Sequence, residues 1–137
     1  MLRLVEPLTL GTLESAVRVS FARDTCAEDD LPSWTPENPS RGHCAVAALT
    51  VNDLLGGLLL RAEVHRGGLH TGYHWWNRLA GVDVDLTADQ FADDEVVGEP
   101  AVIERPPGRP RRYADQYELF QGRVLAALGI EGQSQPG

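Results

Sequence analysis

Cys44 is the side chain with the clearest potential for chemistry. It stands at the start of residues 43–55, an alanine- and leucine-rich segment whose composition predicts a buried helix ending at Gly56-Gly57. The positive end of a helix dipole favours a thiolate, so thiols in this position are often nucleophiles. Gly42 would let a substrate carbonyl approach the backbone closely. The alternative is a small buried hydrophobic side chain, the usual role of free cysteine. Cys26 lies in an acidic loop, and we interpret it as structural.

A nucleophilic thiol needs a base, and the base needs a group that orients it. Residues 72–79 and 82–86 predict two neighbouring strands, with His74 on the first and Asp85 on the second. A four-residue loop would place the two directly opposite, within hydrogen-bond reach. A two-residue turn at Ala80-Gly81 would place them diagonally on the same face. Either register therefore predicts a His74–Asp85 pair, and a solvated polar strand face is the alternative.

Each member of this pair has a rival. Asp83 shares the strand face with Asp85, and position alone does not separate them. His70 is the rival for His74 but falls in a turn, and His65 lies at a strand end where we expect it to be exposed.

An acyl-transfer site also needs donors for the oxyanion. The Cys44 backbone N–H is the first, and Asn38 or the adjacent His43 would supply the second. The alternative for Asn38 is an Asn-Pro turn, and for His43 a helix cap. Trp76 shares the strand face of His74 and could line a substrate pocket.

Metal and cofactor sites have little support in the sequence. Zinc could be held by Cys44, His70, His74 and Asp85, but no CxxC or HExxH motif accompanies them. The paired glycines are not phosphate loops. We therefore expect no cofactor and no metal.

The elements that must position these residues predict an α+β domain with an antiparallel sheet. A helix over 8–22 has an apolar stripe of Leu10, Leu13, Val17 and Phe21. A long loop over 24–42 precedes the Cys44 helix. The remaining expected elements are strands over 58–64, 72–79 and 82–86, a capping box at Thr87–Gln90, a strand within 96–103, a helix over 113–128 and a disordered tail over 131–137.

Composition narrows the function classes. The 137 residues suit one domain, and the net charge of −8 argues against nucleic acid as a partner. No run of about 18 apolar residues predicts a membrane span. The N-terminus, with Glu6 and Pro7, lacks the apolar run of a signal peptide, so we expect a cytoplasmic protein. The oligomeric state stays open.

Three segments, NPSRGHCAVAALTVNDLLGG, GYHWWNRL and VDVDLTADQF, resemble the YunG-like family of small bacterial proteins. The segments SFARDTC, WTPENP and RRYADQYELFQGRV also resemble that family. The order of cysteine at a helix start, histidine on a strand and a polar residue on the next strand is similar to papain-like cysteine enzymes. That resemblance implies one papain-like domain over 1–130, with Cys44 as nucleophile, His74 as base and Asp85 as orienter. Papain-like peptidases have glutamine at the position of Asn38, so this residue departs from the pattern.

The expected function is cysteine-dependent acyl transfer on an amide, ester or thioester, of the amidase, peptidase or deamidase type. The substrate would be a peptide, a protein or a small-molecule amide, and the acidic loop over 24–37 would favour a cationic one. Two alternatives stay open: a transglutaminase-like transferase and a non-catalytic ligand-binding module on the same fold.

Overall fold

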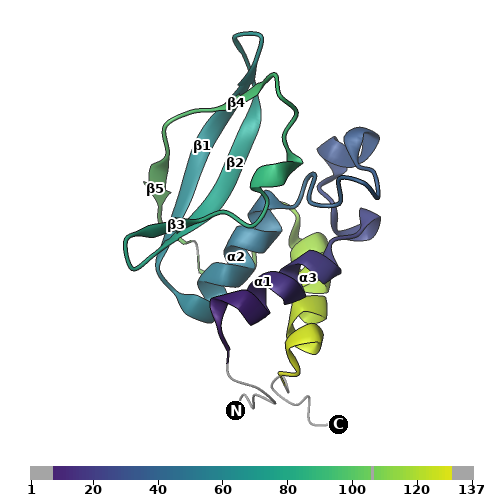
Figure 1. Cartoon of the computed structure of the whole chain (residues 1–137), viewed down its shortest axis with the longest axis vertical. Coiled ribbons are helices and arrows are strands. Elements are labelled where there is room, and N and C mark those ends of the chain that lie inside the picture. The colour runs from purple at the N-terminus through teal and green to yellow at the C-terminus, as the bar shows by residue number, and fades with distance from the viewer. Residues whose placement is uncertain (1–7, 106, 131–137) are drawn as a thin grey trace.

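The computed structural model describes residues 8–105 and 107–130 (Figure 1). Over these residues, helices precede a group of strands, and one long helix follows. The elements are α1 (Leu10–Ser20), η1 (Arg23–Thr25), η2 (Glu28–Ser33), α2 (Cys44–Leu55), β1 (Leu58–Arg66), β2 (Leu69–Leu79), β3 (Val82–Val84), η3 (Ala88–Gln90), β4 (Glu95–Val97), β5 (Ala101–Ile103) and α3 (Ala114–Leu128).

The strands form one antiparallel sheet in the order β3-β2-β1-β4, and β5 also pairs with β1. β1 and β2 pair along their length, whereas β3 pairs only with Asn77–Leu79 of β2. The sheet curls into a half-barrel, and the α-helices gather at one end of it (Figure 1). The expected α+β class with an antiparallel sheet and a C-terminal helix is therefore confirmed. The cysteine is carried by the second α-helix, after α1, which is the order that the stripe over 8–22 predicted.

The main core lies between the helices and one face of the sheet. α1 contributes Leu13 and Val17, but Leu10 of the expected stripe is 43% exposed. α3 contributes Phe120 and Val124, with Gly129 ending the helix in the left-handed conformation as expected. A second apolar cluster, formed by Leu60, Ala62 and Trp76, lies on the opposite face of the β1–β2 pair. The sheet is therefore buried on both sides near its centre.

Of two sequence predictions near the sheet edge, one was incomplete and one was wrong. The segment 96–103 forms two short strands, because Gly98, Glu99 and Pro100 interrupt it and proline cannot donate to a ladder. The capping box does not form: the Gln90 amide donates to the Thr87 carbonyl at 3.1 Å, and Thr87 makes no side-chain cap. Only the three-residue η3 follows.

The predicted hairpin has the shorter of the two turns. Leu79 pairs with Val82, so Ala80 and Gly81 form a two-residue turn, both at positive φ. β3 ends at Val84, two residues earlier than expected, and the next residues leave the ladder. The expected tail over 131–137 lies outside the described residues. Within the described part of the chain, no helix has the length and apolarity to cross a membrane.

Candidate active site

The thiol of Cys44 lies at the first residue of α2. It is next to the edge of β2 at Tyr73, a part of the strand that β3 does not pair with. Gly42 at φ +76° turns the chain, and His43 precedes the helix as its N-cap. The first backbone N–H groups of a helix have no partner within it. Those at the start of α2 are therefore potential donors to a group bound beside Cys44. The side chain is partly exposed, and its Sγ donates to the Tyr73 carbonyl over 3.7 Å. The sequence prediction of a helix starting at this thiol is confirmed.

His74 projects from β2 on the face that carries Leu60, Ala62 and Trp76. Only 1% of the residue is exposed. Its Nε2 lies 2.6 Å from Oδ2 of Asp85, which is the distance of a strong charge-assisted hydrogen bond. Its Nδ1 is buried and has no hydrogen-bond partner among the described residues. One nitrogen is therefore held by a carboxylate, and the other stays free for chemistry.

Electrostatics at His74 favour the imidazolium. Burial disfavours the charged ring, but the hydrogen bond to Asp85 and the nearby Cys44 side chain outweigh burial and raise the pKa of His74 to about 9. The ring is therefore protonated at neutral pH. Because Cys44 is one of the groups that raise this pKa, the thiol and the imidazole interact across the site.

Asp85 lies one residue beyond β3 and turns back toward β2. The register of the hairpin would place Trp76, not His74, opposite Asp85. Diagonal neighbours on a ladder have Cβ atoms about 7–8 Å apart. The contact forms because the chain leaves the ladder after Val84, and the Thr87 N–H donates to Oδ1 of Asp85 at 3.3 Å. The carboxylate is thus aimed by its own loop.

Two aromatic rings enclose the imidazole. Trp76 stacks on it at 5.2 Å between centroids and 25° between planes. Phe91 meets it edge-on at 4.7 Å and 88°. Trp76 is itself held by a hydrogen bond from Nε1 to Asp83 at 3.2 Å. These contacts fix the plane of the imidazole ring.

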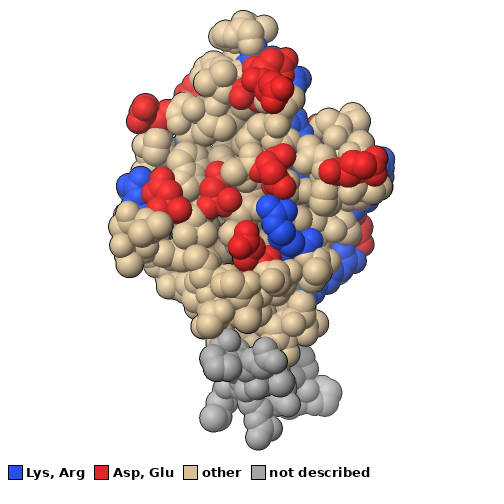
Figure 2. All heavy atoms as spheres, in the orientation of Figure 1, with Lys and Arg blue, Asp and Glu red and all other residues tan. Residues whose placement is uncertain are grey.

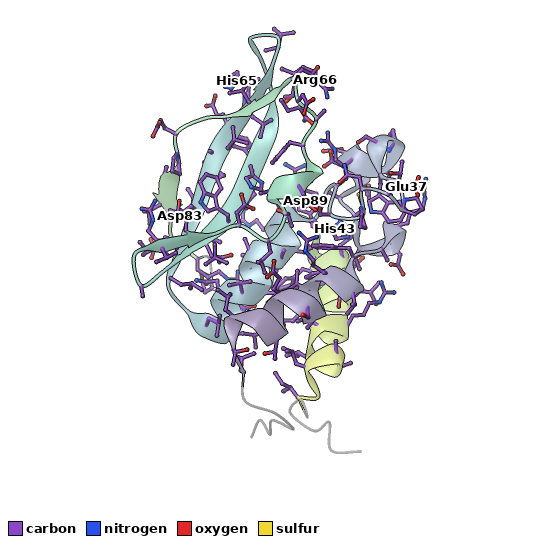
Figure 3. The ribbon with its side chains drawn as sticks, in the orientation of Figure 1. Glu37, His43, His65, Arg66, Asp83 and Asp89 are labelled. Carbon is purple, nitrogen blue, oxygen red and sulfur yellow. The ribbon has the colours of Figure 1, made fainter. Side chains whose placement is uncertain are left out.

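The structure separates the rivals that position alone did not. Oδ1 of Asp83 accepts a hydrogen bond from Nε of Arg78 at 2.5 Å, and Asp83 does not contact His74. Asp83 lies on β3, away from His43 at the start of α2 (Figure 3). His70 binds the Gly72 carbonyl at 2.9 Å and is exposed. His65 lies near the hairpin tip beside Glu63 (Figure 3). Asp85 and His74 are the acid and the histidine that meet.

The two side chains predicted to assist an oxyanion are used elsewhere. Asn38 donates its amide to the Gln90 carbonyl at 2.9 Å and takes part in a turn with Thr35. His43 is fully buried, with Nε2 at 2.7 Å from the Thr25 hydroxyl and Nδ1 at 2.9 Å from the Arg41 carbonyl. Burial also lowers the pKa of His43. The Cys44 N–H is therefore the remaining candidate donor from the predicted set.

Gly42 has a packing role that the sequence did not reveal. A Cβ there would lie 2.5 Å from Sγ of Cys26 and 2.8 Å from Cβ of Asp30. The space that we assigned to a substrate carbonyl is thus filled by η2 and its flanks. Cys26 is buried, and desolvation together with Asp30 raises its pKa to about 12. Its thiol is a packing element beneath the turn that begins α2.

The described residues contain no group of three or more His, Cys, Asp or Glu side chains that could hold a metal ion. Of the four residues considered for zinc, His70 is engaged with the Gly72 carbonyl and His74 with Asp85. A thiol, an imidazole and a carboxylate in this arrangement are groups that can transfer protons.

Comparison with known proteins places the chain in a family. The model of the YunG protein family matches residues 9–129, from just before α1 to the end of α3. This chain belongs to the YunG family. A Bacillus subtilis (strain 168) relative, "Uncharacterized protein YunG", is 38% identical over 58 residues. The match covers 42% of this chain and 46% of that relative, so the curated relative is matched over about half its length. No solved structure matches the chain.

Three site residues were missed by sequence reasoning. Thr87 orients Asp85, Phe91 encloses His74, and Tyr73 contacts the thiol. Thr87 and Phe91 lie within the VDVDLTADQF segment, but their contacts depend on how the chain turns after Val84. Tyr73 adjoins His74, yet it acts through its backbone carbonyl, which no residue type can signal.

Proposed function

We propose that this YunG-family protein is a cysteine-dependent acyl-transfer enzyme with a papain-like arrangement of Cys44, His74 and Asp85. The observation that carries the proposal is the state of His74. Asp85 holds one ring nitrogen, the other is buried without a partner among the described residues, and the nearby Cys44 side chain helps to raise the ring's pKa. A merely structural buried histidine would have both nitrogens satisfied, as His43 does.

Acylation follows from these positions. The Cys44 sulfur attacks the carbonyl carbon of an amide, ester or thioester and forms an S–C bond. The negative charge on the carbonyl oxygen is stabilised by the N–H groups at the start of α2. The imidazolium then gives its Nδ1 proton to the leaving nitrogen, oxygen or sulfur as the C–X bond breaks. The ring is left neutral, with its Nε2–H donating to Asp85.

Deacylation reverses the proton flow. Neutral Nδ1 takes a proton from water, and the resulting hydroxide adds to the thioester carbonyl. The C–S bond then breaks, releasing a carboxylic acid and restoring the thiolate beside the imidazolium. An amine in place of water would give transfer instead of hydrolysis, as in a transglutaminase. We place hydrolysis or deamidation first.

The decisive experiment measures alkylation of Cys44 by iodoacetamide against pH, with the modified cysteine identified by peptide mass spectrometry. Because the imidazolium favours the thiolate, we expect the wild-type protein near neutral pH to react at least about tenfold faster than His74→Gln. The two rates should converge once the pH exceeds the pKa of a free thiol. Equal profiles in the two proteins would contradict the proposal and favour a binding module.

Acyl-enzyme formation is tested with p-nitrophenyl acetate, a generic ester for activated thiols. We expect a burst of p-nitrophenolate equal in amount to the enzyme, absent in Cys44→Ala. Asp85→Asn should weaken the burst, whereas Asp83→Asn is the matched control and should keep it. Asp83 occupies the same strand face and contacts Trp76 but does not contact His74.

A further inference from the structure

Tyr73, whose carbonyl contacts the thiol, also contacts an arginine that lies over two aromatic rings. The Arg61 guanidinium is 4.6 Å from the centroid of the Tyr73 ring and 5.6 Å from that of Trp75. Arg61 pairs directly with Trp75 across β1 and β2, so these side chains share the sheet face opposite to His74. Planar stacking fixes a guanidinium while leaving its edge donors free.

This arrangement continues from the thiol. Sγ of Cys44 contacts the Tyr73 carbonyl. Further along α2, the Asn77 amide donates to the Ala48 carbonyl at 2.9 Å, and Trp75 packs against the cluster of Ala48, Leu49 and Leu59. α2 therefore covers the part of this sheet face that carries Trp75 and Asn77. The part that carries Tyr73 lies past the start of the helix, and Tyr73 is 47% exposed.

Among the described residues no carboxylate forms an ion pair with Arg61, although the chain has a net charge of −8. Glu63, on the same face, contacts His65 instead. Elsewhere acidic and basic side chains lie together, as on the face in Figure 2.

The acidic loop, in contrast, is largely paired. Asp24 binds Arg123 at 2.7 Å, Asp29 lies 3.3 Å from Arg112, and Asp30 lies 3.5 Å from Arg41. The cationic substrate that the composition of this loop suggested is therefore not the one that the contacts favour. The guanidinium that lies over the Tyr73 ring has no carboxylate partner among the described residues, although Glu63 pairs with Tyr73 across the two strands.

We propose that Arg61, with Tyr73 and Trp75, binds a carboxylate carried by the acyl substrate of Cys44. This inference rests on the proposed function and names its substrate class: amides, esters or thioesters with a carboxylate near the carbonyl that is attacked. The guanidinium offers paired N–H donors that match a carboxylate, and the rings supply an apolar floor for the chain between carboxylate and carbonyl.

The test compares alkylating reagents that differ only in charge. N-iodoacetyl-glycine is paired with its neutral amide, and N-iodoacetyl-glutamate α-amide with the glutamine equivalent. The first pair presents a terminal carboxylate, and the second an acidic side chain. For at least one pair, the ratio of charged to neutral rates at Cys44 should be about three- to tenfold higher in wild type than in Arg61→Met. Methionine keeps an apolar cover on the rings without the charge.

Two further variants separate a local site from a general field. Arg61→Lys should keep part of the preference, because the charge remains while the fork of donors is lost. Arg23→Met is the matched control: Arg23 also lies over a tryptophan ring, that of Trp34 at 5.9 Å, and has no ion pair in the described chain. It should leave the ratio unchanged. An unchanged ratio in Arg61→Met, or an equal fall in Arg23→Met, overturns the inference.

The reagents also keep this inference distinct from the proposed function. Thiol activation is read from the neutral reagents and their dependence on His74, whereas carboxylate recognition is read from the ratio. Cys44 is partly exposed, so alkylating reagents can reach its sulfur. The ratio is therefore measurable whether or not His74 activates the thiol.

Discussion

Replacing Asp85 with asparagine removes a charge while retaining an oxygen that can accept the Nε2–H of His74. The hydrogen bond to Asp85 is the largest of the influences that raise the pKa of His74 to about 9, and burial opposes them. Without the carboxylate, Cys44 alone of these groups opposes burial, which is the largest single influence on the pKa of His74. We expect the pKa of His74 in Asp85→Asn to fall to the ordinary value of about 6.5 or below it.

The same change has a stability consequence with a definite sign. A histidine whose pKa rises on folding stabilises the protein fully below about pH 6.5, and that contribution disappears as the pH passes about 9. The difference between these two values, at about 1.4 kcal/mol for each pKa unit, corresponds to about 3 kcal/mol. Wild type should therefore lose stability relative to Asp85→Asn between about pH 6.5 and pH 9.

Proton NMR titration of the imidazole Cε1–H signals measures the pKa directly, with His74→Gln used to assign the signal. Urea unfolding at the two ends of the pH range measures the stability difference. Asp83→Asn is the control, because Asp83 contacts Arg78 and Trp76 without touching His74. A His74 pKa that stays near 9 in Asp85→Asn would refute the reasoning. It would show that Cys44, without Asp85, is sufficient to raise the pKa of the ring.

Three other outcomes follow from the packing. Cys26 should stay unmodified by iodoacetamide in the native protein while Cys44 reacts, because burial raises the pKa of Cys26 to about 12; peptide mass spectrometry distinguishes the two thiols. Gly42→Ala should lower the free energy of unfolding by about 2 kcal/mol or more, since its φ is +76° and the new Cβ would meet Cys26; urea unfolding tests this, and a stability equal to wild type would contradict it. Phe120→Ala removes a fully buried ring and should cost about 3–5 kcal/mol in the same assay, whereas a loss below about 1 kcal/mol would show a core that collapses around the gap.

Periodicity and turn residues were sufficient for most of the fold. The helix beginning at Cys44 and the glycine ends at Gly56 and Gly129 are where the sequence predicted them. β1 and β2 are longer than expected, reaching the Gly67-Gly68 turn, because a paired hairpin continues until its turn regardless of composition. Local pattern predicts where an element exists, while pairing decides where it ends.

For the candidate site, the sequence predicted which strand faces carry the residues better than it predicted their contacts. Strand parity placed His74 and Asp85 on one face, and the structure brings them together. Asn38 and His43 were chosen for their proximity in sequence to Cys44, but both are used by tertiary partners far along the chain or in a turn. A side chain with several hydrogen-bonding atoms pairs with buried polar groups that lie near it in the fold. A single sequence does not reveal which groups those are.

The length of β3 connects the fold to the proposed chemistry. Had the ladder continued to Leu86, Asp85 would face Trp76, and its carboxylate would reach His74 only across a diagonal. Ending the strand at Val84 frees the loop to turn, so that the Thr87 N–H aims Asp85 and Phe91 closes over the ring. The same early end leaves the β2 edge beyond Asn77 unpaired by β3, and the start of α2 brings the thiol to the Tyr73 carbonyl there. A short strand thus provides both the orientation of the proposed base and the space for the proposed nucleophile, which is why the His74–Asp85 pair forms in the diagonal register.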